Sequence, residues 1–294
     1  MDSMVTMVED TFAEAFKMYG VRLIITAINR EWVMHAARCV TGFATSVIGC
    51  GCEAGIEGDV EDAPDGRVGV SVLIFSMTKD SLEKQLLNRI GQCVLTCPTA
   101  SCFNGLDCDE MLPVGKKLRY FGDGFQMSKF INGRRFWRIP IMEGEALIEE
   151  SYGVAEAVGG GNILILADSV EHALYASEKA VSSANVVKGV IMPFPGGVVR
   201  SGSKVGSKYK FLHASTNTAF VPQLRAHTSK DLLSGVRSVL EIVFDGLSLD
   251  AVKKAMRLAI ENAVGCEGVL GISAGNYGGN LGKYRIYLKE VLEV

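Results

Sequence analysis

The sequence lacks any apolar run long enough to cross a membrane. A membrane-spanning helix needs about 20 apolar residues, whereas runs such as residues 23–25 and 163–166 have only the length of a strand. The N-terminal segment is acidic and has neither the positive charge nor the apolar stretch of a secretory signal. We therefore expect a protein with no membrane partner that works in the cytoplasm.

The sequence also lacks the ligand spacings of common metal sites. None of its 4 histidines lies in an H-E-x-x-H pattern, and none of its 8 cysteines belongs to a C-x-x-C pair. Cysteines do gather at Cys93, Cys97, Cys102 and Cys108, but no histidine is near them. We expect free, buried thiols and no bound metal. A metal- or cluster-carrying redox protein is the alternative that these cysteines leave open.

Neither sign of charge is in large excess. The 30 basic and 33 acidic residues give a net charge of −3, and because the signs are interspersed, no overall field would attract nucleic acid. Apolar residues make up 48% of the 294 residues, enough for a sizeable core. We therefore expect a globular protein without a nucleic-acid partner, in which any basic site is local.

What the sequence does contain is an order of elements that occurs twice. In the first half, a strand over residues 22–27 leads to Asn29 as N-cap and to a helix that ends at Gly42. A strand over residues 70–75, a helix from about Asp80 and a strand over residues 93–96 follow. The apolar positions that define the two helices at helical spacing are Val33, Ala36, Ala37 and Val40, and Leu82, Leu86 and Ile90.

The second half repeats this order. A strand over residues 162–167 precedes Asp168, which with Glu171 resembles a capping box at the start of a helix that ends near Ser183. A strand over 239–244, a helix over about 248–264 and a strand over 269–272 follow. Paired strand–helix–strand units predict an α+β fold of two ferredoxin-like, split βαβ lobes related by internal duplication. We place the join between residues 149 and 161 and divide the chain into lobes 1–150 and 151–294.

Residues 194–208 are rich in glycine, serine and lysine. Glycines let backbone N–H groups approach a ligand, hydroxyls donate hydrogen bonds, and lysines supply charge for a carboxylate or phosphate. The segment lacks the G-x-x-x-x-G-K-[ST] pattern of nucleotide-binding loops. The candidates for an anion site are Gly196, Gly197, Ser203, Lys204, Ser207 and Lys208; the alternative is a polar loop that binds nothing.

Glu241 is the sharpest single candidate for chemistry. Strand alternation places it on the same face as Val243, where a lone carboxyl is partly desolvated and its pKa rises. Aligning the two halves on Phe75 and Phe244 places Val72 opposite Glu241, so only one half carries the acid. A glutamate with a raised pKa is a typical general acid or base. The alternative is a glutamate on a solvated face of the sheet.

Residues 121–125 set an acid between glycines and aromatic rings. Phe121, Asp123 and Phe125 could form a stacking wall for a planar ring. The alternative is a tight turn whose aromatic rings belong to the core.

Several motifs resemble the formylmethanofuran:tetrahydromethanopterin formyltransferase family. They fall in the family's order and at similar spacing from residue 10 to the C-terminus. The motifs of the first half are residues 10–16, 42–46, 89–93 and 98–101, and those of the second half are residues 193–197, 203–208, 214–217, 241–243 and 272–276. The chain departs from the family in its cysteine content and in residues 102–111, which puts only that local loop in doubt.

The resemblance implies an enzyme of one-carbon metabolism that moves a formyl group between N-formylmethanofuran and N5 of tetrahydromethanopterin, by direct attack and through a tetrahedral intermediate. It implies two ferredoxin-like lobes, a homodimer or homotetramer, and no tightly bound cofactor. Glu241 would transfer the proton, Thr216 and Asn217 would donate hydrogen bonds to the oxyanion, and Lys204 and Lys208 would hold an acidic substrate tail. The alternative within the family is a non-catalytic subunit of a formyltransferase/hydrolase complex.

Overall fold

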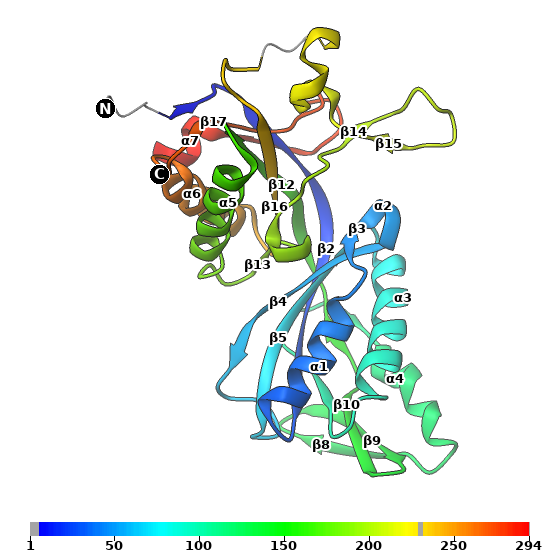
Figure 1. Cartoon of the computed structure of the whole chain (residues 1–294). Coiled ribbons are helices and arrows are strands. Elements are labelled where there is room, and N and C mark those ends of the chain that lie inside the picture. The colour runs from blue at the N-terminus through cyan, green and yellow to red at the C-terminus, as the bar shows by residue number, and fades with distance from the viewer. Residues whose placement is uncertain (1–5, 229–231, 294) are drawn as a thin grey trace. The chain divides into compact units, whose positions relative to one another are not determined.

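The computed structural model describes residues 6–228 and 232–293 (Figure 1). The chain divides into two compact units, one of residues 18–157 and the other of the described residues up to Lys17 together with Val158 onward. Both divisions fall within long strands, β2 (Phe12–Ala27) and β12 (Ala155–Ala167). Residues 6–17 therefore group with the second half of the chain. The division into lobes 1–150 and 151–294 stays a prediction.

The unit of residues 18–157 is a sheet with helices on one face. Its strand order is β4–β5–β2–β6–β10–β9–β8, and neighbours are antiparallel except for the parallel pair β6–β10. Its other strands are β3 (Thr45–Ser46), β4 (Cys52–Val60), β5 (Val68–Ser76), β6 (Ser101–Asn104), β7 (Met111–Leu112), β8 (Met127–Ile131), β9 (Arg134–Ile141), β10 (Gly144–Glu149) and β11 (Tyr152–Gly153). Its helices are α1 (Arg30–Thr41), α2 (Val47–Cys50), α3 (Lys79–Arg89), α4 (Val114–Leu118), the π-helix η1 (Ile90–Val94) and the 3₁₀ helix η2 (Arg119–Gly122).

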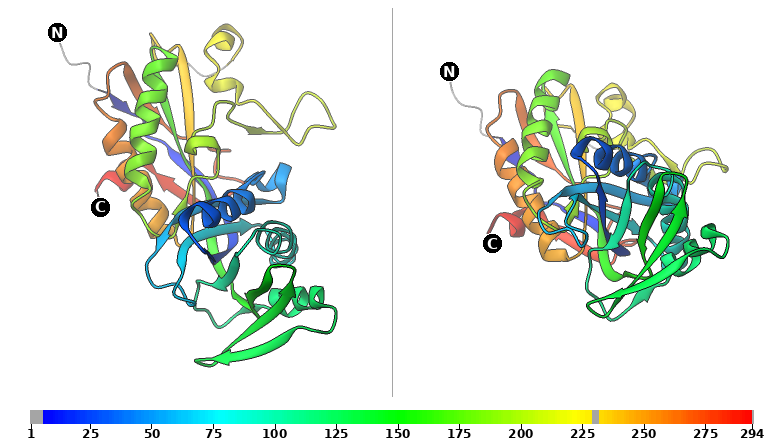
Figure 2. Two further views of the ribbon diagram at one scale, coloured as in Figure 1. Left: turned by 60° about the horizontal axis from the view of Figure 1, so that its bottom comes forward. Right: turned by 90° about the horizontal axis from the view of Figure 1, so that it is seen from below.

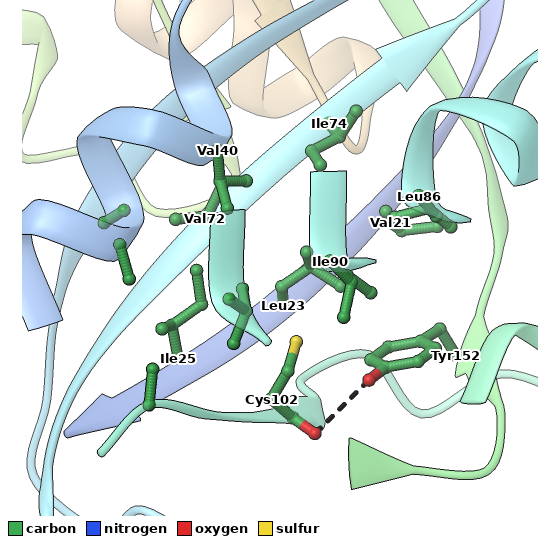
Figure 3. Close-up of a cluster of buried hydrophobic side chains, with 14 of the residues drawn as sticks. Val21, Leu23, Ile25, Val40, Val72, Ile74, Leu86, Ile90, Cys102 and Tyr152 are labelled. Carbon is green, nitrogen blue, oxygen red and sulfur yellow. Dashed lines mark hydrogen bonds between the residues drawn. The ribbon is translucent and has the colours of Figure 1, made fainter. Parts of the chain in front are cut away.

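The core of this unit lies between the sheet and helices α1 and α3. Alternate residues of β2 and β5, among them Leu23 and Val72, meet Val40 of α1 and Leu86 of α3 (Figure 3). These side chains are fully buried. The period-2 pattern of the strands and the helical spacing of the apolar residues therefore meet on one face, as the sequence predicts.

The start and end of α1 confirm the prediction from local signals. The side chain of Asn29 accepts a hydrogen bond from the Trp32 N–H at 3.1 Å, and the Gly42 N–H donates to the Cys39 carbonyl. An Asn at this position satisfies one of the N–H groups that a helix leaves without a partner. Short-range signals are sufficient here because every partner lies within a few residues.

The predicted strand over residues 93–96 is wrong. Helix α3 continues into η1, where the Leu95 N–H donates a hydrogen bond to the Ile90 carbonyl at 3.0 Å. The strand that follows the second helix of this unit is β6, which begins only at Ser101. Ile90 and Val94 are four residues apart and both enter the core, which a helical turn permits. A short apolar run fits either structure, and only its packing distinguishes them.

The second unit is also a sheet with helices on one face, in the order β1–β17–β12–β16–β13. Figures 1 and 2 show α5 and α6 side by side against it. Besides β12 and the start of β2, its strands are β1 (Met7–Val8), β13 (Val190–Ile191), β14 (Lys204–Val205), β15 (Ala214–Ser215), β16 (Ser238–Gly246), β17 (Val269–Ser273) and β18 (Tyr284–Tyr287). Its helices are α5 (Val170–Ala184), α6 (Leu249–Ala263), α7 (Leu288–Glu293) and the 3₁₀ helices η3 (Pro195–Gly197), η4 (Thr218–Phe220) and η5 (Pro222–His227).

The cap of α5 is one residue later than predicted. Ser169, not Asp168, accepts the capping hydrogen bond, from the His172 N–H at 3.2 Å. Asp168 instead bonds the His172 ring nitrogen Nδ1 at 2.6 Å. Both residue types are good N-caps, so the sequence alone does not decide between neighbours.

The two units share one strand order. In each, a first strand (β2 or β12) lies between the third (β5 or β16) and the fourth (β6 or β17), and the second (β4 or β13) pairs with the third. In the described part of the chain, no helix is both long and apolar enough to span a membrane.

The predicted alignment of the two halves is out of register by one residue. Phe244 packs in the core under α5 and α6, but Phe75 is not part of the core under α1 and α3, to which Val72 belongs. A shift of one residue moves a strand position to the opposite face. Val72 is therefore not the counterpart of Glu241, which faces away from the helices.

Candidate active site

Glu241 lies near the middle of β16, on the sheet face opposite α5 and α6. Its neighbour Ile242 points into the core under these helices, so alternation turns Glu241 the other way, as the sequence predicts. Leu164 of β12 lies opposite it in the ladder. On its other side, Val199 exchanges two backbone hydrogen bonds with it, at 2.7 and 2.9 Å.

The carboxyl of Glu241 is half-buried and has no hydrogen-bond or ion-pair partner among residues 6–228 and 232–293. Burial raises the pKa of Glu241 to about 7, and no other cause contributes. A carboxyl that is desolvated and receives no donor holds its proton more tightly. Near neutral pH both forms are populated, which is what a general acid or base requires.

A cavity of about 870 Å³ opens beside Glu241. This volume is in the range of sites for cofactors and other small molecules. Its walls come from the second unit alone, mainly from β16 and from the long connection between β13 and β16. The lining residues are Leu164, Val170, Leu174, Phe194, Pro195, Val198–Gly202, Thr216, Asn217, Phe220–Gln223 and Arg237–Glu241.

Thr216 and Asn217, the predicted oxyanion donors, both line this cavity together with Glu241. The Thr216 hydroxyl donates to the Ser201 carbonyl at 3.2 Å. Gly202 has a φ of +52°, and a Cβ there would lie 3.6 Å from Glu241 Oε2 and 3.3 Å from the Asn217 Cβ. Residues 199–202 therefore run close along the carboxyl, and only a small residue fits at 202.

None of the six predicted anion-binding residues, all of which the structure describes, is part of the cavity wall. Lys204 belongs to the hairpin of β14 and β15, and its Nζ donates to the hydroxyl of Thr218 in η4 at 3.0 Å. The Ser207 hydroxyl accepts from the Tyr209 N–H, and Lys208 is exposed beside it. This hairpin extends from the unit in Figure 1.

Gly196 and Gly197 form the turn η3. A Cβ on Gly197 would lie 2.8 Å from the Val181 side chain, so this glycine is needed for packing against α5. Pro195 and Val198, which flank the pair, line the cavity. The two glycines thus shape the turn, while Pro195 of the same turn contributes to the wall.

Phe121, Asp123 and Phe125 belong to the other unit, at the end of η2. The two phenylalanine rings are exposed to 69% and 76%, so the alternative of core aromatics is wrong. Asp123 has a φ of +50° and closes the turn with a backbone bond from its N–H to the Tyr120 carbonyl. The site role predicted for these three residues stays a prediction.

Two arginines of the cavity wall, Arg200 and Arg237, were missed from the sequence. The signal available in the sequence is position: Arg200 lies in the glycine-rich segment 194–208, and Arg237 lies four residues before Glu241. All of residues 237–241 line the cavity, so strand alternation does not single out Arg237. In residues 6–228 and 232–293, no group of three or more His, Cys, Asp or Glu side chains is arranged to hold a metal ion.

Comparisons with known proteins cover nearly the whole chain. A family model described as "Formylmethanofuran-tetrahydromethanopterin formyltransferase" matches residues 1–141, and one described as "FTR, proximal lobe" matches residues 144–291. The formylmethanofuran–tetrahydromethanopterin formyltransferase of Methylococcus capsulatus is 57% identical over 97% of each chain. A component of the formyltransferase/hydrolase complex of Methylorubrum extorquens is 47% identical over 97% of this chain and 96% of its own.

Solved structures agree. The formyltransferase of Methanosarcina barkeri matches with a TM-score of 0.92 and 47% identity, over 97% of this chain and 98% of its own. The Methylorubrum extorquens complex, solved with methylofuran, contains a chain that matches with a TM-score of 0.94 and 46% identity, over 97% and 96% of the two chains. The sequence resemblance is thus confirmed, and the chain belongs to the formylmethanofuran–tetrahydromethanopterin formyltransferase family.

Proposed function

We propose that this chain transfers a formyl group between N-formylmethanofuran and N5 of tetrahydromethanopterin, with Glu241 as the proton-transfer residue. The observation that carries the assignment is the Glu241 carboxyl, which faces a cavity of about 870 Å³ and has a pKa of about 7. Membership of the family supports the reaction that we propose, and the cavity beside Glu241 supports the proposed location of the site.

The transfer has chemical demands that these residues can meet. The pterin nitrogen attacks the formyl carbon, the carbonyl oxygen becomes an oxyanion, and the leaving amine departs with a proton. Protonated Glu241 would give that proton, and the carboxylate that results would take up the proton that the pterin nitrogen loses as its new bond forms, which restores the acid. Hydrogen bonds from Thr216 and Asn217 would stabilise the oxyanion. The reverse reaction uses the same groups, with the proton transfers in the opposite order.

Positive charge near the cavity suits an acidic substrate tail. We assign this binding to Lys204 and Lys208 of the hairpin, with Ser203 and Ser207 as hydrogen-bond donors, and add Arg200 and Arg237 of the cavity wall. Gly196 and Gly197 would shape the wall, while Phe121, Asp123 and Phe125 of the other unit would contact a planar substrate ring. Formyl transfer changes no oxidation state, so we propose that no tightly bound cofactor takes part.

The test is turnover by purified protein with both coenzymes, followed through the absorbance of the formylated pterin. Glu241→Gln should lower kcat by about 10²- to 10⁴-fold, the range for loss of a general acid or base, with little change in KM. Glu178→Gln, an exposed glutamate on α5, is the matched control and should behave as wild type. Near-normal turnover of Glu241→Gln would refute the assignment.

We further propose that both units are ferredoxin-like lobes of one duplicated ancestor, and that the chain acts as a cytoplasmic homodimer or homotetramer. The shared strand order supports the first point. The lobes 1–150 and 151–294 would be the duplicated lengths, with the N-terminal residues packed with the second lobe.

A second candidate function is that of a component within a larger complex. It is favoured by the Methylorubrum extorquens relative, whose name places it in a formyltransferase/hydrolase complex. Co-purification with stoichiometric partners, and turnover only within that assembly, would support it. Full turnover by the isolated chain would exclude a non-catalytic role.

A further inference from the structure

The hairpin of β8 and β9 gives the sheet of the unit of residues 18–157 an open edge. Asn132 and Gly133, with positive φ of +49° and +78°, form the two-residue turn that an Asn-Gly pair favours. Among the described residues, the outermost strand β8 pairs with β9 alone (Figure 1). In an antiparallel strand, alternate residues aim their N–H and C=O groups away from the neighbour. β8 therefore offers backbone groups to a further strand.

The side chains around this edge carry a large excess of positive charge. Residues 114–138 hold seven basic side chains and one acid, in a chain whose net charge is −3. Among the described residues, three of the cations have no acidic partner: Lys116, Arg119 and Lys129. The other four form ion pairs with acids of other segments, Lys117 with Glu83, Arg134 with Glu149, Arg135 with Glu150 and Arg138 with Glu145.

Aromatic rings lie between the cations. The Arg135 guanidinium carbon lies 4.4 Å from the ring centroid of Phe130, which is opposite it in the ladder. The Arg119 guanidinium carbon lies 4.7 Å from the ring centroid of Trp137 and 4.4 Å from that of Tyr120. An arginine stacked on an aromatic ring is held in one place, so it loses little freedom when a carboxylate binds.

Protection of the edge does not explain this composition. A lysine on an edge strand prevents unwanted pairing with other sheets, and Lys129 alone would suffice for that purpose. Its neighbours Met127 and Phe130 are apolar, yet they are 56% and 59% exposed. An open strand edge with exposed apolar side chains is typical of a peptide-binding surface, in which backbone hydrogen bonds give affinity and side chains give selectivity.

The charge of the edge selects its partner. A two-fold contact brings the same patch together from two copies of a chain. Two copies paired through β8 would therefore place cations opposite cations, which destabilises paired strands. A strand that carries carboxylates would instead meet cations on both of its faces. Arg119 and Arg135 lie on the face of Phe130, and strand alternation places Lys129 on the other face.

We propose that β8 is a docking site for an extended, acidic segment of another protein, which adds to the sheet as a strand. The backbone of this segment pairs with β8, and its carboxylates bind Arg119, Lys129 and Arg135. Its apolar side chains cover Met127 and Phe130. The docking site does not depend on formyl transfer.

The test uses a short, fluorescein-labelled peptide of Glu-Val repeats, with a Lys-Val peptide of the same length for comparison. At low ionic strength, fluorescence anisotropy should show the glutamate peptide binding at least about tenfold more tightly. Its affinity should fall as salt is added, because exposed charges are screened. The glutamate peptide N-methylated at every peptide bond cannot pair with β8 and should not bind.

Two variants test the side chains. Lys129→Glu should weaken binding of the glutamate peptide about tenfold or more, and Phe130→Ser about fivefold through loss of apolar contact. Lys188→Glu and Phe43→Ser make the same changes at exposed positions away from the edge and should bind as wild type. All four side chains are exposed, so the variants should fold, which circular dichroism checks.

The inference is overturned if the wild type does not bind the glutamate peptide, if it binds both peptides equally, or if Lys129→Glu binds as wild type. A single-stranded DNA of the same net charge is measured alongside, and equally tight binding of it would indicate a general anion surface instead. If the wild type binds no peptide and Lys129→Glu changes the molar mass in light scattering, the edge belongs to a contact between copies of this chain.

Discussion

Glu14 and Glu241 are two acids on strands of the same unit, and their surroundings are opposite. The carboxylate of Glu14 receives four backbone N–H groups. Burial alone would raise its pKa, but these hydrogen bonds lower it below the usual value. Glu241 receives no donor among the described residues, and burial raises its pKa to about 7.

The comparison separates two uses of a buried carboxyl. Where hydrogen-bond donors surround the carboxyl, it stays ionised at neutral pH, and its hydrogen bonds stabilise the conformation of a loop. Where donors are missing, the charge is poorly stabilised and the proton can be exchanged near neutral pH. The first environment makes Glu14 structural, and the second makes Glu241 suited to catalysis.

The largest effect should come from removing the structural acid. Glu14→Ala leaves four N–H groups of the 277–282 loop without their acceptor, so the free energy of unfolding should fall by about 3 kcal/mol or more. Denaturant unfolding followed by circular dichroism measures it. Asp10→Ala removes an exposed acid paired with Lys289 and should cost less than about 1 kcal/mol. If Glu14→Ala and Asp10→Ala lose the same free energy of unfolding, the structural role assigned to Glu14 is wrong.

The proposed proton donor should appear in the pH profile of the reaction. Under the proposal, protonated Glu241 is the active form in transfer from the formamide to the pterin, so the rate should fall about tenfold per pH unit above its pKa of about 7. Glu241→Gln should lack this limb, and Glu178→Gln should keep it. A wild-type rate that stays constant from about pH 6 to pH 9 would remove Glu241 from the proton-transfer role.

The contributions of Glu241 and Glu14 to the free energy of unfolding should change with pH in opposite directions. The raised pKa of Glu241 means that its contribution is most favourable below 4.5 and is lost as the pH rises through about 7. Glu241→Gln should therefore become more stable than wild type at about pH 8, by at most about 3 kcal/mol. Glu14 has a lowered pKa, so its contribution is present above 4.5 and is lost as the pH falls. Denaturation curves of Glu241→Gln at about pH 5 and about pH 8, and of Glu14→Gln at about pH 3 and about pH 6, would show whether the signs differ.

The sequence reveals these two acids to different degrees. Glu241 stands out because strand alternation is a local signal. Glu14 does not stand out, since the N–H groups that it binds lie 263 to 268 residues further along the chain. The order of most strands and helices follows from short-range patterns and caps. The strand predicted at residues 93–96 and the alignment on Phe75 are wrong because both depend on packing between distant residues, which a short stretch of sequence does not contain.

The smallest effect concerns the glycine that lets the chain pass Glu241. Gly202→Ala adds a Cβ at a φ of +52°, which costs about 1 kcal/mol, and it also crowds the Asn217 Cβ at 3.3 Å. Gly206→Ala is the matched control, because its φ is +82° and a Cβ there would meet nothing within 4 Å. The two variants should lose similar stability, but only Gly202→Ala should also lower kcat, since the added methyl displaces the segment beside the carboxyl. If Gly206→Ala lowers kcat equally, the effect belongs to the flexibility of the hairpin and not to the space around Glu241.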